Sequence, residues 1–181
     1  TRHTIGQFFP FAVKEGEDVP AFLPIGGPTP VRQTSSTHGA DGYITTDPAV
    51  IQKSVERLQK KIESHIESFS FFESEERQGA RTLIVTYGVT ARAARAACHE
   101  LLREKGVPVS LLVLKTLWPV PERVLWDAAA GIERVLVVEM NLGQYVHEIR
   151  RVLCDKKVDF FGRMCGELIT PAEIIREALH G

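Results

Sequence analysis

Residues 82–102 read TLIVTYGVTARAARAACHELL, and this stretch decides the fold. It opens with a short, β-branched apolar run at 83–85, which is typical of a strand buried on both faces of a parallel sheet. Gly88 then permits a tight turn, and Thr90 is placed to cap an alanine-rich helix that can lie close to the sheet. The stretch therefore predicts a strand, a turn and a helix.

The same alternation continues to the C-terminus. Further strands are predicted at 109–114, 134–140 and 158–161, and helices at 122–130, 142–153 and 171–180. The last helix should begin with a capping box, because Glu173 follows Thr170 by three residues. Four strands that alternate with helices predict a parallel three-layer α/β sheet.

The residues before this array differ in character. Six of the ten prolines lie in the first 48 residues, which predicts an extended arm over 1–47. An amphipathic segment follows at 48–67, with Asp47 as the N-cap of a helix that should run from Pro48 to about Ser64. Residues 68–79 are predicted to be a linker, and residues 80–181 the α/β domain.

Charge and hydropathy argue against several kinds of partner. A formal net charge of −1 gives no electrostatic case for binding nucleic acid or a membrane surface. No apolar run reaches the roughly 18 residues of a membrane-spanning helix, and the start lacks the apolar core of a signal peptide. We therefore expect a cytoplasmic protein. The polar start without an initiator Met suggests a piece of a longer polypeptide.

The cysteines and the basic residues suggest no chemistry of their own. Three cysteines without a CxxC pair predict free, buried thiols and no metal site; they are Cys98, Cys154 and Cys165. Cys98 and His99 are adjacent on a predicted helix, so their side chains point about 100 degrees apart and form no dyad. Five basic residues are predicted to form a solvated helix face: Arg92, Arg95, His99, Arg103 and Lys105.

The candidate binding residues lie where predicted strands end. Gly88 and Thr90 belong to a turn that could hold an anion at a helix N-terminus. Glu139, Asn141 and Gln144 follow the third strand, where a carboxylate could act as a general base or bind a ligand. A structural reading is open for both groups, and we favour it: the turn only connects two elements, and the polar side chains hold neighbouring loops.

A polar loop inside the arm, 37–43, brings His38, Asp41 and Tyr43 together between glycines. It could contact a ligand, but we favour a fixed turn that docks against another domain. We count Trp118, from the proline-rich turn 118–121, as a fourth interface residue.

Several motifs occur together in a fixed order: TH at 37–38, GY at 42–43, TTDP at 45–48, YG at 87–88, ARAA at 91–94, LKTLWP at 114–119, EMNLGQ at 139–144 and GELITP at 166–171. As a set they resemble the C-terminal part of the alpha subunit of a 2-oxoacid:ferredoxin oxidoreductase, most nearly the 2-oxoglutarate type. The resemblance covers residues from about 37 to the C-terminus.

This resemblance implies a complex that oxidatively decarboxylates a 2-oxoacid with coenzyme A, giving an acyl-CoA, CO2 and reduced ferredoxin. Thiamine diphosphate, Mg2+ and iron-sulfur clusters would serve the parent complex but would lie outside this chain. The chain would follow the pyrimidine-binding N-terminal domain of the alpha subunit and would also meet the beta subunit. It should then hold no catalytic residue or cofactor and be inactive alone.

The resemblance also implies a fold. The chain should be similar to the transketolase C-terminal domain, with a mostly parallel sheet of about five strands and one antiparallel edge. We expect the fifth strand in the arm or near 163–165.

Our leading hypothesis is a structural domain for subunit assembly. The alternatives are a small-molecule module that binds coenzyme A or another anion at the strand ends, and a parent enzyme specific for branched-chain 2-oxoacids.

Overall fold

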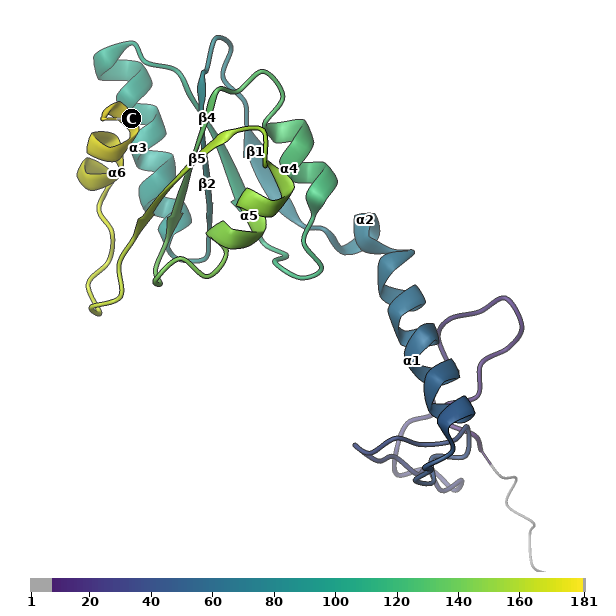
Figure 1. Ribbon diagram of the computed structural model, residues 1–181. Helices are drawn as coiled ribbons and strands as arrows, with labels where there is room; N and C mark the ends of the chain where they lie inside the picture. Colours follow the sequence, from purple (N-terminus) through teal and green to yellow (C-terminus); the bar gives the residue numbers. More distant parts are fainter. Residues whose placement is uncertain (1–7, 181) are drawn as a thin grey trace, which may run out of the picture. The chain divides into compact units, whose positions relative to one another are not determined.

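A computed structural model describes residues 8–180, which fall into two compact units. The first unit ends at Ile66 and the second begins at Glu67. The first contains the arm and one long helix, and the second contains the sheet (Figure 1). The finer division predicted at residues 47, 67 and 79 stays a prediction.

In the first unit, residues 8–47 form no helix or strand apart from one antiparallel bridge between His38 and Ile44. Helix α1 (Pro48–Glu63) begins where the sequence predicts. The Asp47 carboxylate accepts hydrogen bonds from the N–H groups of Ala49 and Val50 at 2.9 and 3.4 Å, as an N-cap should. The apolar stripe of α1 contains no buried residue.

The second unit is a five-stranded sheet with helices on both faces. Its strands are β1 (Phe72–Glu75), β2 (Thr82–Tyr87), β3 (Val109–Leu114), β4 (Arg134–Glu139) and β5 (Lys157–Gly162), in the order β1-β3-β2-β4-β5. The β2–β3, β2–β4 and β4–β5 pairs are parallel, and only β1 is antiparallel, to β3. The predicted mostly parallel fold with one antiparallel edge is confirmed.

The antiparallel strand lies at an unexpected place. We expected the fifth strand in the arm or near 163–165, and that was wrong, because β1 comes from the predicted linker 68–79. Short helix α2 (Ile66–Phe69) precedes it. The segment FESE has only four residues and no buried side chain, so neither length nor apolar alternation marks it as a strand.

Two helix layers cover the sheet, as Figure 1 shows. Helices α3 (Thr90–Lys105) and α6 (Pro171–Leu179) pack on one face, where Ala94, Ala97 and Leu101 are fully buried. Helices α4 (Glu122–Ala128) and α5 (Val146–Val152) pack on the other. The predicted small side chains of α3 thus let it lie close on the sheet.

Two helix starts differ from the prediction. Thr90 does not cap α3: the N-cap is Val89, which makes no side-chain cap hydrogen bond, and Thr90 is the first helical residue and is buried. Helix α5 begins at Val146 rather than near Leu142, because the intervening residues form a loop that hydrogen bonds with Glu139 and Asn141.

The last helix has the predicted capping box, and it yields a pH-dependent prediction. The Glu173 carboxylate accepts hydrogen bonds from the Thr170 N–H and hydroxyl at 2.9 and 2.8 Å, and it also pairs with Arg163. The backbone hydrogen bond from Thr170 is the largest cause that lowers the pKa of Glu173 from about 4.5 to about 2.

Since this pKa is lower in the folded chain, the stabilisation is complete above pH 4.5 and is lost as the pH falls towards 2. In urea unfolding at a series of pH values, Glu173→Gln should flatten the fall in unfolding free energy over that window. Glu177→Gln, on the same helix, should leave the fall unchanged. Equal slopes for wild type and Glu173→Gln would contradict the assignment.

Candidate functional site

All five predicted binding residues lie at one edge of the sheet. Gly88 and Thr90 follow β2, and Glu139 ends β4 with Asn141 and Gln144 behind it. Strands β2 and β4 are parallel neighbours, so their carboxyl ends meet. This is the usual place for ligands in open α/β sheets. A ligand could bind here only through polar groups that the protein itself leaves without a hydrogen bond.

The Glu139 carboxylate is fully buried and surrounded by donors. One oxygen accepts from the Tyr87 hydroxyl at 2.7 Å, the Asn141 side-chain amide at 3.0 Å and the Tyr145 N–H at 3.1 Å; the other accepts from the Val146 N–H at 3.1 Å. Burial, followed by this hydrogen bond to Glu139, raises the pKa of Tyr87, which therefore stays a donor. The carboxylate is engaged by the protein itself.

Asn141 is engaged in the same way. Its side-chain oxygen accepts from the N–H groups of Gly143 and Gln144 at 2.7 and 2.9 Å, and its amide nitrogen donates to the Tyr87 hydroxyl at 2.6 Å. Gly143 has φ +94°, and a Cβ there would come within 3.3 Å of Val146. These contacts hold the loop between β4 and α5. They support the structural reading of Glu139 and Asn141, whose roles at the strand ends stay a prediction.

Tyr87 belongs to the YG motif at 87–88 but was not counted among the candidate binding residues, although it is central to the site. It ends β2, and its hydroxyl joins β2 to both Glu139 and Asn141. Its position could have indicated this role, because it is a polar residue at the end of a buried strand. In a parallel sheet, the neighbouring strand ends beside it.

Gly88 has no side chain to offer a ligand, whereas Gln144 has an exposed polar one. Gly88 has φ +61° and borders a cavity of about 490 Å³. The charged residues that line this cavity, Glu73 and Lys115, pair with each other at 2.5 Å. The Gln144 side chain is exposed. Its contribution to the loop is its N–H, which donates to Asn141.

A smaller hollow of about 260 Å³ opens beside the start of α3. Its lining is mainly apolar and includes Val89, Met140, Leu168 and Ile169, together with Thr90 and Arg92. The Thr90 residue is only 3% exposed, yet its hydroxyl has no hydrogen-bond partner within residues 8–180. The exposed Arg92 guanidinium has no carboxylate partner within that range either. The hollow thus combines apolar walls with two free donors.

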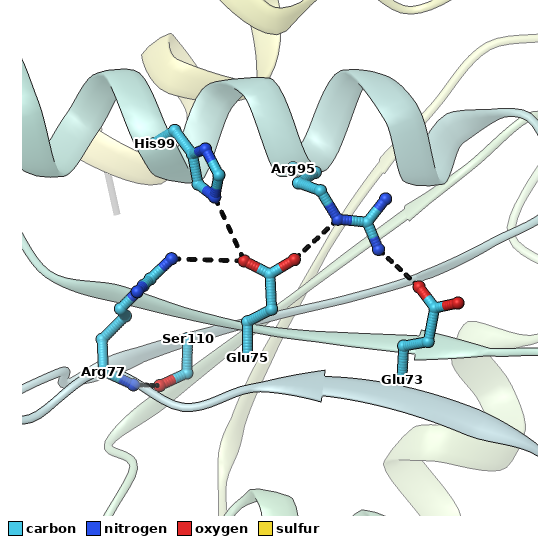
Figure 2. Close-up of polar contacts among 6 residues, drawn as sticks. All are labelled: Glu73, Glu75, Arg77, Arg95, His99 and Ser110. Atoms are coloured by element: carbon cyan, nitrogen blue, oxygen red, sulfur yellow. Dashed lines mark hydrogen bonds and ion pairs between the residues drawn. The ribbon is translucent and has the colours of Figure 1, made fainter.

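A second polar cluster fixes the edge strand (Figure 2). The Glu75 carboxylate on β1 meets Arg95 of α3 at 2.6 Å, His99 of α3 at 3.3 Å and Arg77 at 3.2 Å; Glu73 meets Arg95 at 2.5 Å. Partial burial raises the pKa of Glu75, but the hydrogen bonds from Arg95 and His99 outweigh it, so its pKa lies below the ordinary range. Arg95 was predicted to lie on a solvated helix face but is partly buried against two carboxylates of β1, a strand that was not expected beside it; His99 is exposed, as predicted.

Removing the ion pairs of Arg95 with Glu73 and Glu75 should make β1 open more often. Arg95→Leu breaks two ion pairs at the sheet edge, so amide exchange in 72–75 should become about tenfold faster, which corresponds to about 1.4 kcal/mol of local opening. Arg103→Leu is the matched control on the same helix, since within residues 8–180 Arg103 pairs only with its neighbour Glu104. Hydrogen exchange followed by mass spectrometry checks this. Equal exchange in the two variants would mean that backbone pairing alone holds β1.

The three predicted interface residues of the arm form a local turn in the first unit. The His38 ring stacks on Phe11 with centroids 3.5 Å apart. The Asp41 carboxylate accepts from the Tyr43 N–H at 3.0 Å, and the Arg32 guanidinium lies 4.0 Å from the Tyr43 ring centre. These contacts support a fixed turn, while the interface role stays a prediction.

Trp118, the fourth predicted interface residue, lies in the second unit after β3 and is 77% exposed. Its loop is nevertheless held, because the Tyr145 hydroxyl donates to the Leu117 carbonyl at 3.1 Å. A large aromatic side chain on a fixed loop is a common feature of protein interfaces.

The cysteines are free thiols, as predicted, but only Cys98 is buried. Burial raises the pKa of Cys98 to about 12, so it is unreactive. Cys154 and Cys165 are exposed, and the expectation of buried thiols was wrong for both because each lies in a loop. Residues 8–180 contain no group of three or more His, Cys, Asp or Glu side chains that could hold a metal ion. Within the same range, no helix is both long and apolar enough to cross a membrane.

Comparisons with known proteins agree with this fold. Residues 80–174 match the family model of the pyruvate:ferredoxin oxidoreductase core domain II. The chain is 33% identical to 2-oxoglutarate synthase subunit KorA of Methanothermobacter thermautotrophicus, over 96% of this chain and 46% of that protein. It is 35% identical to ketoisovalerate oxidoreductase subunit VorB of the same organism, over 54% of this chain and 28% of that protein.

A solved structure resembles nearly the whole chain. It is 2-oxoglutarate:ferredoxin oxidoreductase from Magnetococcus marinus with 2-oxoglutarate, coenzyme A and succinyl-CoA bound, with a TM-score of 0.80 and 26% identity, covering 96% of this chain and 30% of that chain. The chain thus spans less than half the length of each of these three relatives. The resemblance inferred from the sequence motifs is confirmed, and the chain belongs to the pyruvate:ferredoxin oxidoreductase family as a member of its core domain II.

Proposed function

We propose that this chain is a structural and assembly domain of a 2-oxoacid:ferredoxin oxidoreductase and holds other parts of that enzyme in position. One observation carries the proposal. Glu139, the only buried carboxylate at the strand ends within residues 8–180, already binds four protein donors. A general base needs a lone pair within reach of a substrate proton, whereas this carboxylate is fully buried and held by those four donors.

The donor set does not fit the cofactors expected of the parent enzyme. Mg2+ of a thiamine diphosphate site needs free oxygen ligands, whereas Glu139 and Asn141 use theirs within the loop. An iron-sulfur cluster needs four close thiolates, and this chain has three cysteines that occupy a helix and two separate loops. We therefore assign thiamine diphosphate, Mg2+ and the clusters to the rest of the parent enzyme.

The parent reaction that we propose is oxidation of 2-oxoglutarate with coenzyme A, giving succinyl-CoA, CO2 and reduced ferredoxin. Relatives of the 2-oxoglutarate type match 79–96% of the chain, whereas the ketoisovalerate relatives match 54% and 66%. A branched-chain 2-oxoacid is the alternative substrate. Turnover of the parent enzyme with 2-oxoglutarate against 2-oxoisovalerate decides between them.

The partners that we propose are the remaining part of the same alpha subunit and the beta subunit. The test is to delete residues 80–181 from the parent subunit, coexpress it with the beta subunit, and measure both assembly by light scattering and 2-oxoglutarate-dependent dye reduction. We expect neither assembly nor turnover. A truncated enzyme that assembles and turns over would refute the proposal.

Binding of coenzyme A or another anion is the second candidate function. The hollow beside α3 favours it, because the Thr90 hydroxyl and the Arg92 guanidinium are free donors at a helix N-terminus. Calorimetric titration of the 181-residue chain with coenzyme A separates the two functions.

A further inference from the structure

The loops at the carboxyl edge of the sheet carry large apolar side chains that face water. Each of the four parallel strands is followed by at least one of them, and each is 53–77% exposed: Val89, Trp118, Leu142, Met164 and Leu168. Carboxyl ends of parallel strands meet at one edge, and in Figure 1 the loops after β4 and β5 lie together at the lower end of the sheet. We call these five residues the strand-end face.

Hydrogen bonds fix the loops that carry Leu142 and Trp118, so these side chains are held in exposed positions. Asn141 and Glu139 fix the loop that carries Leu142, and Tyr145 fixes the loop before Trp118. Exposed apolar surface disfavours the free state by roughly 25 cal/mol per Å², so a held apolar face is typical of an interface. Single exposed apolar residues scattered over a surface are common and need no partner. Here, however, the loop after every parallel strand carries at least one of them.

The hollow beside α3 is lined by two residues of the strand-end face, and its lining indicates which side chains of a partner would fit there. Val89 and Leu168 line it, so an apolar side chain can be buried there. Arg92 adds a positive charge without a carboxylate partner within residues 8–180, and the start of α3 has no side-chain cap. Complementarity therefore calls for an apolar side chain next to a carboxylate.

We propose that the strand-end face docks the part of the full-length subunit that this chain does not span. The docking segment places an apolar side chain in the hollow and a carboxylate against Arg92. This inference rests on the proposed assembly function. Because the chain covers 46% of its KorA relative, more than half of such a subunit is available as occupant. Interfaces of this kind bury about 800 Å² per partner around a few anchors, and five large apolar side chains suffice for that core.

The chain contains a natural probe and two controls for this proposal. Cys165 lies in the loop after β5, between Met164 and Leu168 of the face, and is exposed. Cys154 is also exposed but lies before β5, at the opposite edge of the sheet. Cys98 is buried and reports unfolding. N-ethylmaleimide labelling, resolved by peptide mass spectrometry, measures all three thiols in one sample.

In the 181-residue chain, we expect Cys165 and Cys154 to react at similar rates at every protein concentration. In the full-length subunit assembled with its beta subunit, Cys165 should react at least tenfold more slowly, while Cys154 keeps its rate. Equal rates in the assembled enzyme overturn the proposal. Protection of Cys165 in the 181-residue chain also overturns the proposal. If the protection grows with protein concentration, the occupant is a second copy of the chain. If the protection is independent of concentration, the occupant is this chain's own arm.

A matched pair of variants in the assembled enzyme tests the contact itself. Leu142→Asp places a charge on the face, whereas Leu102→Asp places one on an exposed position of α3 towards the opposite edge. Loss of one anchor should raise the Cys165 labelling rate in Leu142→Asp about tenfold, towards the rate in the 181-residue chain, and leave it unchanged in Leu102→Asp. Cys98 must stay unlabelled in both, which shows that the domain is folded. Equal Cys165 rates in the two variants overturn the proposal.

The outcomes for the two proposals are separable. If the enzyme needs residues 80–181 to assemble but Cys165 stays reactive, the assembly function stands and docking uses another surface. If the truncated enzyme assembles but Cys165 is protected in the complete one, the assembly function is wrong and the face still has its occupant.

Discussion

Glu139→Ala should lower the free energy of unfolding by about 3–5 kcal/mol. The substitution leaves the Tyr87 hydroxyl and the N–H groups of Tyr145 and Val146 without their acceptor. Each buried donor that loses its partner costs roughly 1–3 kcal/mol. Urea unfolding followed by circular dichroism measures the change.

Two further variants make this result specific. Glu139→Gln keeps the shape and one acceptor oxygen, so it should cost less, about 2 kcal/mol. Glu133→Ala removes a carboxylate that pairs with Arg81 at 2.5 Å where both side chains are mostly exposed, and it should have a much smaller effect than either change at Glu139. If Glu139→Ala costs no more than Glu133→Ala, the carboxylate does not hold the loops and is available for a ligand.

Gly162→Ala should cost about 2–3 kcal/mol, although its backbone conformation suits any residue. A Cβ at the end of β5 would meet the Asn141 carbonyl oxygen at 2.5 Å and would also overlap the Phe160 ring. The ring can turn away, but the Asn141 carbonyl belongs to the loop that Glu139 fixes. The loop or the strand end therefore has to move.

The matched control is Gly131→Ala. Gly131 has φ +73° and open space around it, so the added methyl group strains only the backbone, by about 1 kcal/mol. Thermal and urea unfolding of both variants provide the comparison. A smaller effect at Gly162 than at Gly131 would contradict the close approach of β5 to the Asn141 loop.

Much of the α/β array could be predicted because its signals are local. β3 runs from Val109 to Leu114 as expected, since six apolar or small residues in succession allow burial on both faces. The last helix was marked by Thr170, Pro171 and Glu173, whose capping contacts need no distant partner. The strand and the helix start are each determined by contacts and preferences of a few residues that are neighbours in sequence.

The edge strand and the site depended on distant partners and could not be predicted in the same way. Strand β1 is polar, and Glu75 is held by Arg95 and His99, twenty and more residues away. Tyr87 and Glu139 are 52 residues apart in sequence and meet only because β2 and β4 are neighbours in the sheet. The sequence named Glu139 and Asn141, but only the structure shows that their oxygens are already used.

The most direct test of the central claim is a calorimetric titration of the 181-residue chain with coenzyme A, thiamine diphosphate and 2-oxoglutarate. If the strand ends are structural and the domain serves assembly, none of the three binds with a dissociation constant below about 1 mM, which corresponds to less than about 4 kcal/mol of binding free energy. Micromolar binding that Arg92→Ala abolishes would contradict this account and make the hollow beside α3 a ligand site.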